Sequence, residues 1–134
     1  MTTFIESGVT AAKGFEAAGE HCGIRKNRAK KDLGLIVSDR PASAAAVYTR
    51  NLVKGAPLTV TQAHIADGRA RAIVCNSGIA NTCAFDGIEK AEAMCALTAE
   101  ALGIDAADVV VASTGVIGPS IDIAPIAAGL PRLA

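Results

Sequence analysis

Apolar residues in this chain gather in short runs that end at polar or turn-forming residues, as in strands buried in a sheet. Residues 33–38 form one such run, which we expect to end before Pro41 because proline cannot donate to a ladder. Residues 44–49 form a second β-prone stretch, with Val47 and Tyr48 as its best packing residues. The first half of the chain therefore predicts two strands.

Two further strands are predicted in the second half. Residues 71–75 read as a strand that runs into a turn at residues 76–78. Residues 108–112, rich in valine, predict a strand that is interrupted at Thr114 and Gly115.

The clearest predicted helix lies between these two strands. Asp86 with Glu89 three residues later is a capping-box variant, and Gly103 supplies a C-terminal stop. Six residues between them share a helical spacing: Ile88, Ala91, Met94, Cys95, Thr98 and Leu102. Strand, helix and strand in this order indicate a βαβ-like unit, and hence an α/β fold of mixed α+β character.

Residues 57–67 allow two interpretations. Pro57 at the start, Gly68 at the end, and Leu58, Thr61 and Ile65 on one face favour a short helix. The β-branched content of the segment favours a strand instead. No repeat or linker divides the chain, so we expect residues 1–134 to form a single domain.

Composition and charge narrow the classes of function. Half of the residues are apolar and 3% are aromatic, so a core of small and branched side chains is expected. Thirteen basic and thirteen acidic residues cancel, which argues against a nucleic-acid binder. The basic residues concentrate in residues 25–31, without aromatic residues between them to stack on bases. We interpret this run as a loop that faces solvent or an acidic partner surface.

Location and metal binding leave little signal in the sequence. Residues 1–6 lack the basic start and apolar stretch of a signal peptide, and no run approaches the roughly 20 apolar residues of a membrane helix. Four cysteines are present without a CxxC pair: Cys22, Cys75, Cys83 and Cys95. They predict buried free thiols in a reducing compartment, the cytoplasm, and neither a metal nor a cofactor motif is apparent.

Residues 113–118, Ser-Thr-Gly-Val-Ile-Gly, are the most informative candidate for chemistry. Gly115 allows a positive φ or a close approach, and its backbone N–H beside the Thr114 hydroxyl would form a pair of neutral donors. Such a pair can hold the oxyanion that develops in acyl transfer. The alternative is a plain turn after a strand. Neither phosphate-binding glycine pattern is present.

Residues 76–81 form a second candidate, in which Asn76, Asn81 and Ser77 could bind a carboxylate or could simply cap a turn. A serine nucleophile would need a base, and no spacing ties His21 or His64 to a serine. A self-contained Ser/His triad is therefore not expected.

Read together, these segments resemble the N-terminal chain of the ornithine acetyltransferase (glutamate N-acetyltransferase) family of arginine biosynthesis. The resemblance covers nearly the whole chain and rests on five segments in order and spacing: residues 8–15, 31–39, 47–51, 70–78 and 112–118. The Ser-Thr-Gly-Val-Ile-Gly hexapeptide matches the family pattern in full.

The resemblance implies a layered fold related to the DmpA-like aminopeptidases and a precursor that cuts itself before a threonine. The resulting α and β chains assemble as α2β2, and the N-terminal threonine of the β chain is the nucleophile. It passes acetyl from N-acetylornithine to glutamate by a ping-pong cycle, and some members also use acetyl-CoA. The oxyanion hole of the family maps onto Thr114 and Gly115.

Two departures from the family pattern qualify these expectations. Ile79 stands where asparagine is usual, which questions a ligand role for the loop at residues 76–81. The chain also stops before the self-cleavage threonine, so alone it is expected to be inactive and to expose apolar surface beyond residue 109. Two alternatives remain: a related amide hydrolase, and a non-catalytic binding or assembly module.

Overall fold

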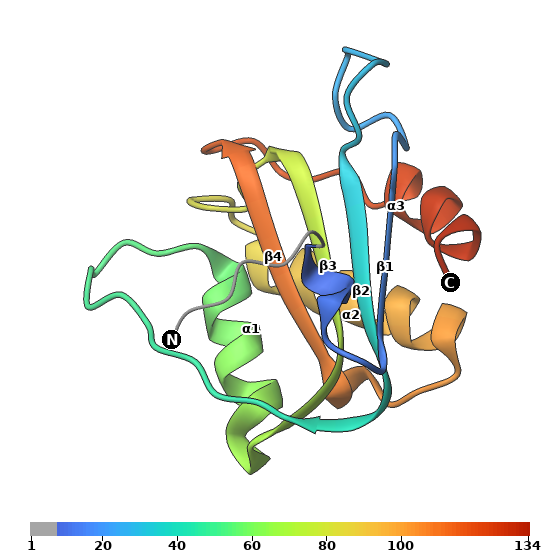
Figure 1. Ribbon diagram of the computed structural model, residues 1–134. Coiled ribbons are helices and arrows are strands. Elements are labelled where there is room, and N and C mark those ends of the chain that lie inside the picture. Colours follow the sequence, from blue (N-terminus) through green and yellow to red (C-terminus); the bar gives the residue numbers. More distant parts are fainter. Residues whose placement is uncertain (1–7) are drawn as a thin grey trace, which may run out of the picture.

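The computed structural model describes residues 8–134, which form one four-stranded sheet with three α-helices around it (Figure 1). The strands are β1 (Phe15–Glu20), β2 (Leu33–Ser43), β3 (Arg69–Ile79) and β4 (Val109–Val116), and they lie in the order β1-β2-β3-β4. The β1–β2 and β2–β3 pairs are antiparallel, whereas β3 and β4 are parallel. The mixed α/β fold is thereby confirmed.

Helix α2 (Gly87–Leu102) makes the crossover between the two parallel strands, as the strand–helix–strand order predicted. Together with α3 (Ala124–Gly129) it lies behind the sheet in the view of Figure 1. The core forms between these helices and one sheet face. Its fully buried side chains include Leu33, Leu35, Val74, Met94, Val109 and Ile126.

Helix α1 (Ala56–His64) lies along the outer side of β4 and satisfies part of that edge (Figure 1). The Thr61 hydroxyl donates to the Val111 carbonyl at 3.1 Å and accepts from the Val111 N–H at 3.3 Å. The His64 Nδ1 atom lies 2.8 Å from the Val109 carbonyl oxygen. The helical interpretation of residues 57–67 is confirmed, and the helix ends in a 3-10 turn before Gly68 at φ 77°.

Three strands are longer than the sequence predicted. Strand β2 passes Pro41, because the register shifts between Val37 and Ala42 and the proline falls in the irregular stretch. Strand β3 continues through residues 76–78, and β4 continues through residues 114–115. The turn predicted at residues 76–78 and the break predicted at residues 114–115 were wrong, because these two segments pair with each other in the parallel ladder.

Three local predictions also failed. Residues 44–49 form no strand, and Val47 is 99% exposed. Helix α2 begins as predicted after Asp86, but no side-chain hydrogen bond caps it; the Asp86 carboxylate accepts from the Ser120 hydroxyl at 2.6 Å instead. Ile88, assigned to the apolar face, is 47% exposed.

Strand β1 and helix α3 were not anticipated, because β1 has only alanine, glycine and glutamate after Phe15, which are residues depleted in strands, and α3 spans only six residues. The basic run at residues 25–31 lies in the connection between β1 and β2, as predicted. Residues 1–6, where no targeting signal was expected, lie outside the described part. None of the helices in residues 8–134 has the length and apolarity to cross a membrane.

The Thr61 contact predicts that Thr61→Val destabilises the fold. Valine keeps the shape of the side chain but leaves the buried Val111 N–H and carbonyl without their partner, which costs about 1–3 kcal/mol. Chemical denaturation should show this loss. Thr59→Val, at an exposed position of the same helix, should stay within about 0.5 kcal/mol; equal effects would contradict the role of Thr61.

Candidate functional site: the paired glycines of strands β3 and β4

Thr114 and Gly115 lie near the end of β4, directly beside Ser77 and Gly78 of β3 in the parallel register. The two candidate segments therefore form one site, although 37 residues separate Ser77 from Thr114. Both segments have a hydroxyl residue followed by glycine. This shared Ser/Thr-Gly pattern after two strands is the signal by which their pairing could have been predicted.

The two glycines are in backbone-to-backbone contact that excludes any side chain. Both have φ at 132°, a region that L-residues other than glycine rarely adopt. A Cβ atom on Gly115 would overlap the carbonyl group of Gly78 and lie 2.7 Å from the Ile79 nitrogen. The position of Gly115 is therefore set by the peptide of Gly78.

The donors of Thr114 and Gly115 lie at the outer corner of the sheet. The N–H of Val111 points outward to Thr61. Regular ladder alternation along β4 would give the N–H of Gly115 the same outward direction. The Thr114 side chain is exposed and shares the sheet face opposite α2 with Val110. A hydroxyl and a backbone N–H thus lie close together at this corner.

A hollow of about 270 Å³ opens beside Thr114 on the same sheet face. Ser77, Cys75 and Lys31 contribute to its lining, so polar groups of β3 and of the basic loop face the same space as Thr114.

Asp32 organises the loop that leads to this hollow. Its buried carboxylate accepts from the N–H of Cys22 at 2.7 Å and of Arg25 at 2.8 Å, with His21 Nδ1 at 3.1 Å. Burial works to raise the pKa of Asp32, but the N–H groups of Arg25 and Cys22 hold that pKa below its ordinary value. The charged carboxylate is therefore the form that holds the loop.

The asparagines of residues 76–81 have structural partners within the chain. Asn76 Nδ2 donates to the Ile79 carbonyl at 3.0 Å, and Asn81 Nδ2 donates to the Gly87 carbonyl at 2.9 Å. Both residues are buried, and Asn81 has φ at 49°. Hydrogen bonds to main-chain carbonyls therefore account for both amide nitrogens.

Neither histidine hydrogen-bonds to a serine or threonine within residues 8–134. His21 contacts the Lys30 carbonyl and Asp32, whereas His64 contacts Val109 and Glu92. The described part contains no Ser/His pair of the kind that activates a serine.

All four cysteines are free, as predicted, but only Cys95 is buried and Cys75 and Cys83 are exposed. Burial raises the pKa of Cys95 to about 12 and is the main reason that the pKa of Cys22 is raised to about 11. These two thiols stay protonated at neutral pH. Among the described residues, no group of three or more His, Cys, Asp and Glu side chains is placed to hold a metal ion.

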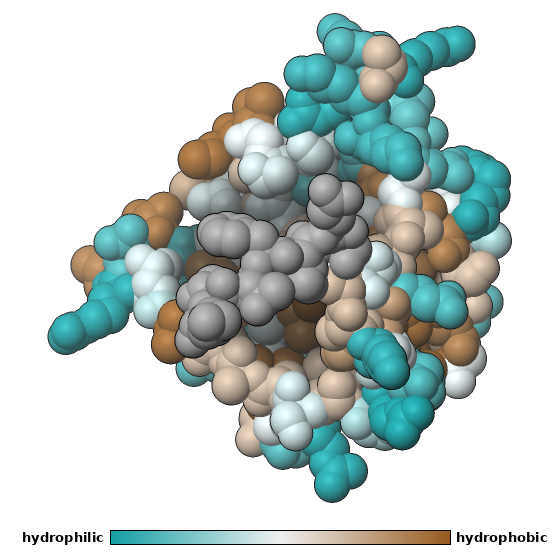
Figure 2. Space-filling view, in the orientation of Figure 1, coloured by the Kyte–Doolittle hydropathy of each residue, from teal (hydrophilic) through white to brown (hydrophobic). Residues whose placement is uncertain are grey.

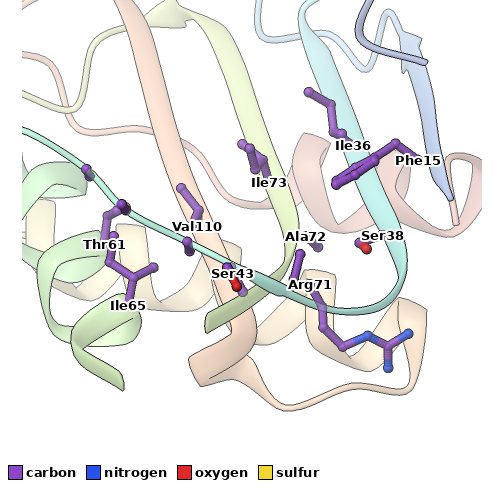
Figure 3. A pocket seen from close by; sticks show the side chains of 15 residues that line it. Phe15, Ile36, Ser38, Ser43, Thr61, Ile65, Arg71, Ala72, Ile73 and Val110 are labelled. Carbon is purple, nitrogen blue, oxygen red and sulfur yellow. The ribbon is translucent and has the colours of Figure 1, made fainter. Parts of the chain in front are cut away.

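The sheet face that carries Thr114 is apolar over its lower part. Ile36, Ile73 and Val110 project from three neighbouring strands to the same side, and Phe15 lies next to Ile36 (Figure 3). They line a groove of about 290 Å³. Figure 2 views this face and shows hydrophobic side chains around a hollow, with the hydrophilic basic loop above.

Comparison with known proteins identifies the family. Residues 16–134 match the ArgJ family. The chain belongs to this family. Its N-terminal resemblance to the ornithine acetyltransferases is thereby confirmed.

Two ArgJ relatives show how much of such a protein the chain represents. The arginine biosynthesis bifunctional protein ArgJ of Halalkalibacterium halodurans is 48% identical over 132 residues, which is 96% of this chain and 32% of the relative. That of Bacillus subtilis is 45% identical over 127 residues, 93% of this chain and 31% of the relative. The chain thus spans about a third of the length of these ArgJ proteins.

Solved structures confirm the fold. The ArgJ protein of Bacillus halodurans superposes with a TM-score of 0.89 at 47% identity, over 94% of this chain and 66% of that one. The ornithine acetyltransferase of Mycobacterium tuberculosis, complexed with ornithine, gives 0.87 at 39% identity, over 94% and 68%.

The glycine contact predicts a severe effect of Gly115→Ala. The methyl group would overlap the Gly78 carbonyl, and the positive φ alone costs about 1–3 kcal/mol. Gly118→Ala is the matched control, because Gly118 has φ at 104° but open space around its Cα. Chemical denaturation should show a larger loss for Gly115→Ala; equal losses would contradict the close contact.

Proposed function

We propose that this chain is the N-terminal part of an ornithine acetyltransferase that moves acetyl from N-acetylornithine to glutamate. The observation that carries the proposal is the corner formed by the Thr114 hydroxyl and the Gly115 N–H, which lies at the open end of the β4 edge. Membership of the ArgJ family and the likeness to an ornithine acetyltransferase complexed with ornithine support the substrate class.

Thr114 and Gly115 act as the oxyanion hole in this proposal. When a nucleophile adds to the acetyl carbonyl, its oxygen becomes an anion that both donors stabilise more strongly than the neutral carbonyl. The neutral hydroxyl and N–H need no proton transfer to do this. The close backbone contact of Gly115 with Gly78 would keep the Gly115 N–H in place before the reaction begins.

The nucleophile in this account is the N-terminal threonine of a β chain, released when the precursor cuts itself. Its hydroxyl adds to the acetyl group, the ornithine amine leaves with a proton, and an acetyl-threonine ester remains. The amine of glutamate then attacks the ester and restores the threonine. Residues 8–134 contain no hydrogen-bonded Ser/His pair, which is consistent with a nucleophile that lies outside these residues.

The apolar sheet face supports a partner of this kind. Ile73 is 39% exposed at its centre, and Val116 and Ile117 beyond the site are 59% and 62% exposed. The β chain would cover this face, so that its threonine reaches the corner at Thr114. We place the α2β2 assembly in the cytoplasm, where the four free thiols persist.

The oxyanion role predicts that Thr114→Ala in the complete two-chain enzyme lowers kcat about 10²–10³-fold, because one of two donors is lost. Steady-state acetyl transfer from N-acetylornithine to glutamate measures it. Ser113→Ala removes the neighbouring hydroxyl, which ladder alternation places on the opposite face, and should leave kcat close to its starting value.

The same assay distinguishes the alternatives. Transfer that requires glutamate supports the acetyltransferase, whereas equal ornithine release without glutamate indicates the amide hydrolase. Unchanged turnover in Thr114→Ala would contradict the oxyanion hole and leave a binding or assembly role for the chain.

A further inference from the structure

The side chain of Arg25 reaches from the basic loop to the strand beside the proposed oxyanion hole. Its Nε donates to the Ser77 hydroxyl oxygen at 3.0 Å, and its Nη2 donates to the same oxygen. Ser77 is the residue that pairs with Thr114 across the parallel strands. Arg25 thus binds a residue 52 positions away that lies on the strand next to Thr114.

The loop also packs directly on Gly78. A Cβ atom there would lie 2.8 Å from Ile24 Cγ2 and 3.3 Å from Arg25 Cγ, so the two side chains occupy the space that glycine leaves. The peptide of Gly78 in turn leaves no space on Gly115. Residues 24–25 therefore pack on Gly78, and Gly78 packs on Gly115, with no space for a side chain at either glycine.

Asp32 holds this packing in place. Its carboxylate accepts from the Arg25 N–H at 2.8 Å, and its own carbonyl accepts from the Ser77 N–H at 2.8 Å. Arg25 and Ser77 are thus both attached to the buried Asp32 by their backbones and to each other by their side chains. Such a closed set of bonds fixes distances better than any single contact.

We propose that Arg25 is a positioning residue for the oxyanion hole: it holds Ser77 and Gly78 so that Thr114 and Gly115 keep their geometry. The proposal rests on the proposed function of Thr114 and Gly115. It assigns a role to one residue of the basic loop, whereas Arg28 of the same loop is exposed and has no such contact with the strands.

The test uses the complete two-chain enzyme with Arg25→Ala, Ser77→Ala and Arg28→Ala, each also combined with Thr114→Ala. Positioning predicts that Arg25→Ala lowers kcat about 10- to 100-fold, because a displacement of about 1 Å is enough for such a loss. The KM for N-acetylornithine should change little. Arg28→Ala should behave as the parent enzyme.

The double variants show whether Arg25 acts through Thr114. Once Thr114 is alanine, Arg25→Ala should lower kcat much less than in the parent, and Ser77→Ala should reproduce the pattern with the arginine in place. Equal losses in both backgrounds, or a raised KM with unchanged kcat, would overturn the positioning role. If Arg25→Ala fails to fold, Ser77→Ala alone decides by the same criteria.

The outcomes separate this inference from the proposed function. Thr114→Ala without effect would reject the oxyanion hole itself. Thr114→Ala with its expected loss, together with Arg25→Ala and Ser77→Ala at parental kcat, would reject only the role of Arg25.

Discussion

The backbone contact between Gly78 and Gly115 is the constraint on which the site depends. The two strands can approach this closely only because Gly115 has no side chain, since a Cβ atom there would overlap the Gly78 carbonyl group. The pairing of β3 and β4 continues on both sides of this contact, as far as Ile79 and Val116. It also places Thr114 beside Ser77, so that the candidate chemistry and its support belong to the same pair of strands.

The position of the site follows from what covers the sheet and what does not. Helices α2 and α3 bury one face, and α1 satisfies the β4 edge at Val109 and Val111 through His64 and Thr61. Among the described residues, the opposite face carries apolar side chains, including Ile36, Ile73 and Val110 (Figure 3). Thr114 lies where this face meets the β4 edge.

Local signals in the sequence were sufficient for the βαβ unit, whereas for α1 they left a strand as the alternative. Pro57 favours the start of α1, Gly68 ends the 3-10 turn that follows α1, and Gly103 ends α2. These preferences belong to the residues themselves, so they can be recognised from the local sequence. Valine-rich residues 109–111 likewise read as a strand without knowledge of their partners.

Long-range pairing accounts for what the sequence alone did not predict. The ends of β3 and β4 depend on one glycine meeting another 37 positions away, and the Arg25–Ser77 contact spans 52 positions. Local sequence patterns predicted turns at the ends of β3 and β4, and they predicted a charged side chain in a loop for Arg25. The repeated Ser/Thr-Gly pattern indicates that Gly78 pairs with Gly115 only when β3 and β4 are already known to be adjacent in the sheet.

The most direct test of the central claim is the carbonyl stretching frequency of the acetyl-enzyme, measured by isotope-edited infrared spectroscopy with ¹³C-labelled acetyl. In the proposed oxyanion hole, hydrogen bonds from Thr114 and Gly115 to the carbonyl oxygen would weaken its double bond, so the complete enzyme should absorb at a lower frequency than its Thr114→Ala variant. Identical bands in the two proteins would show that Thr114 does not contact the acetyl oxygen and would contradict the account.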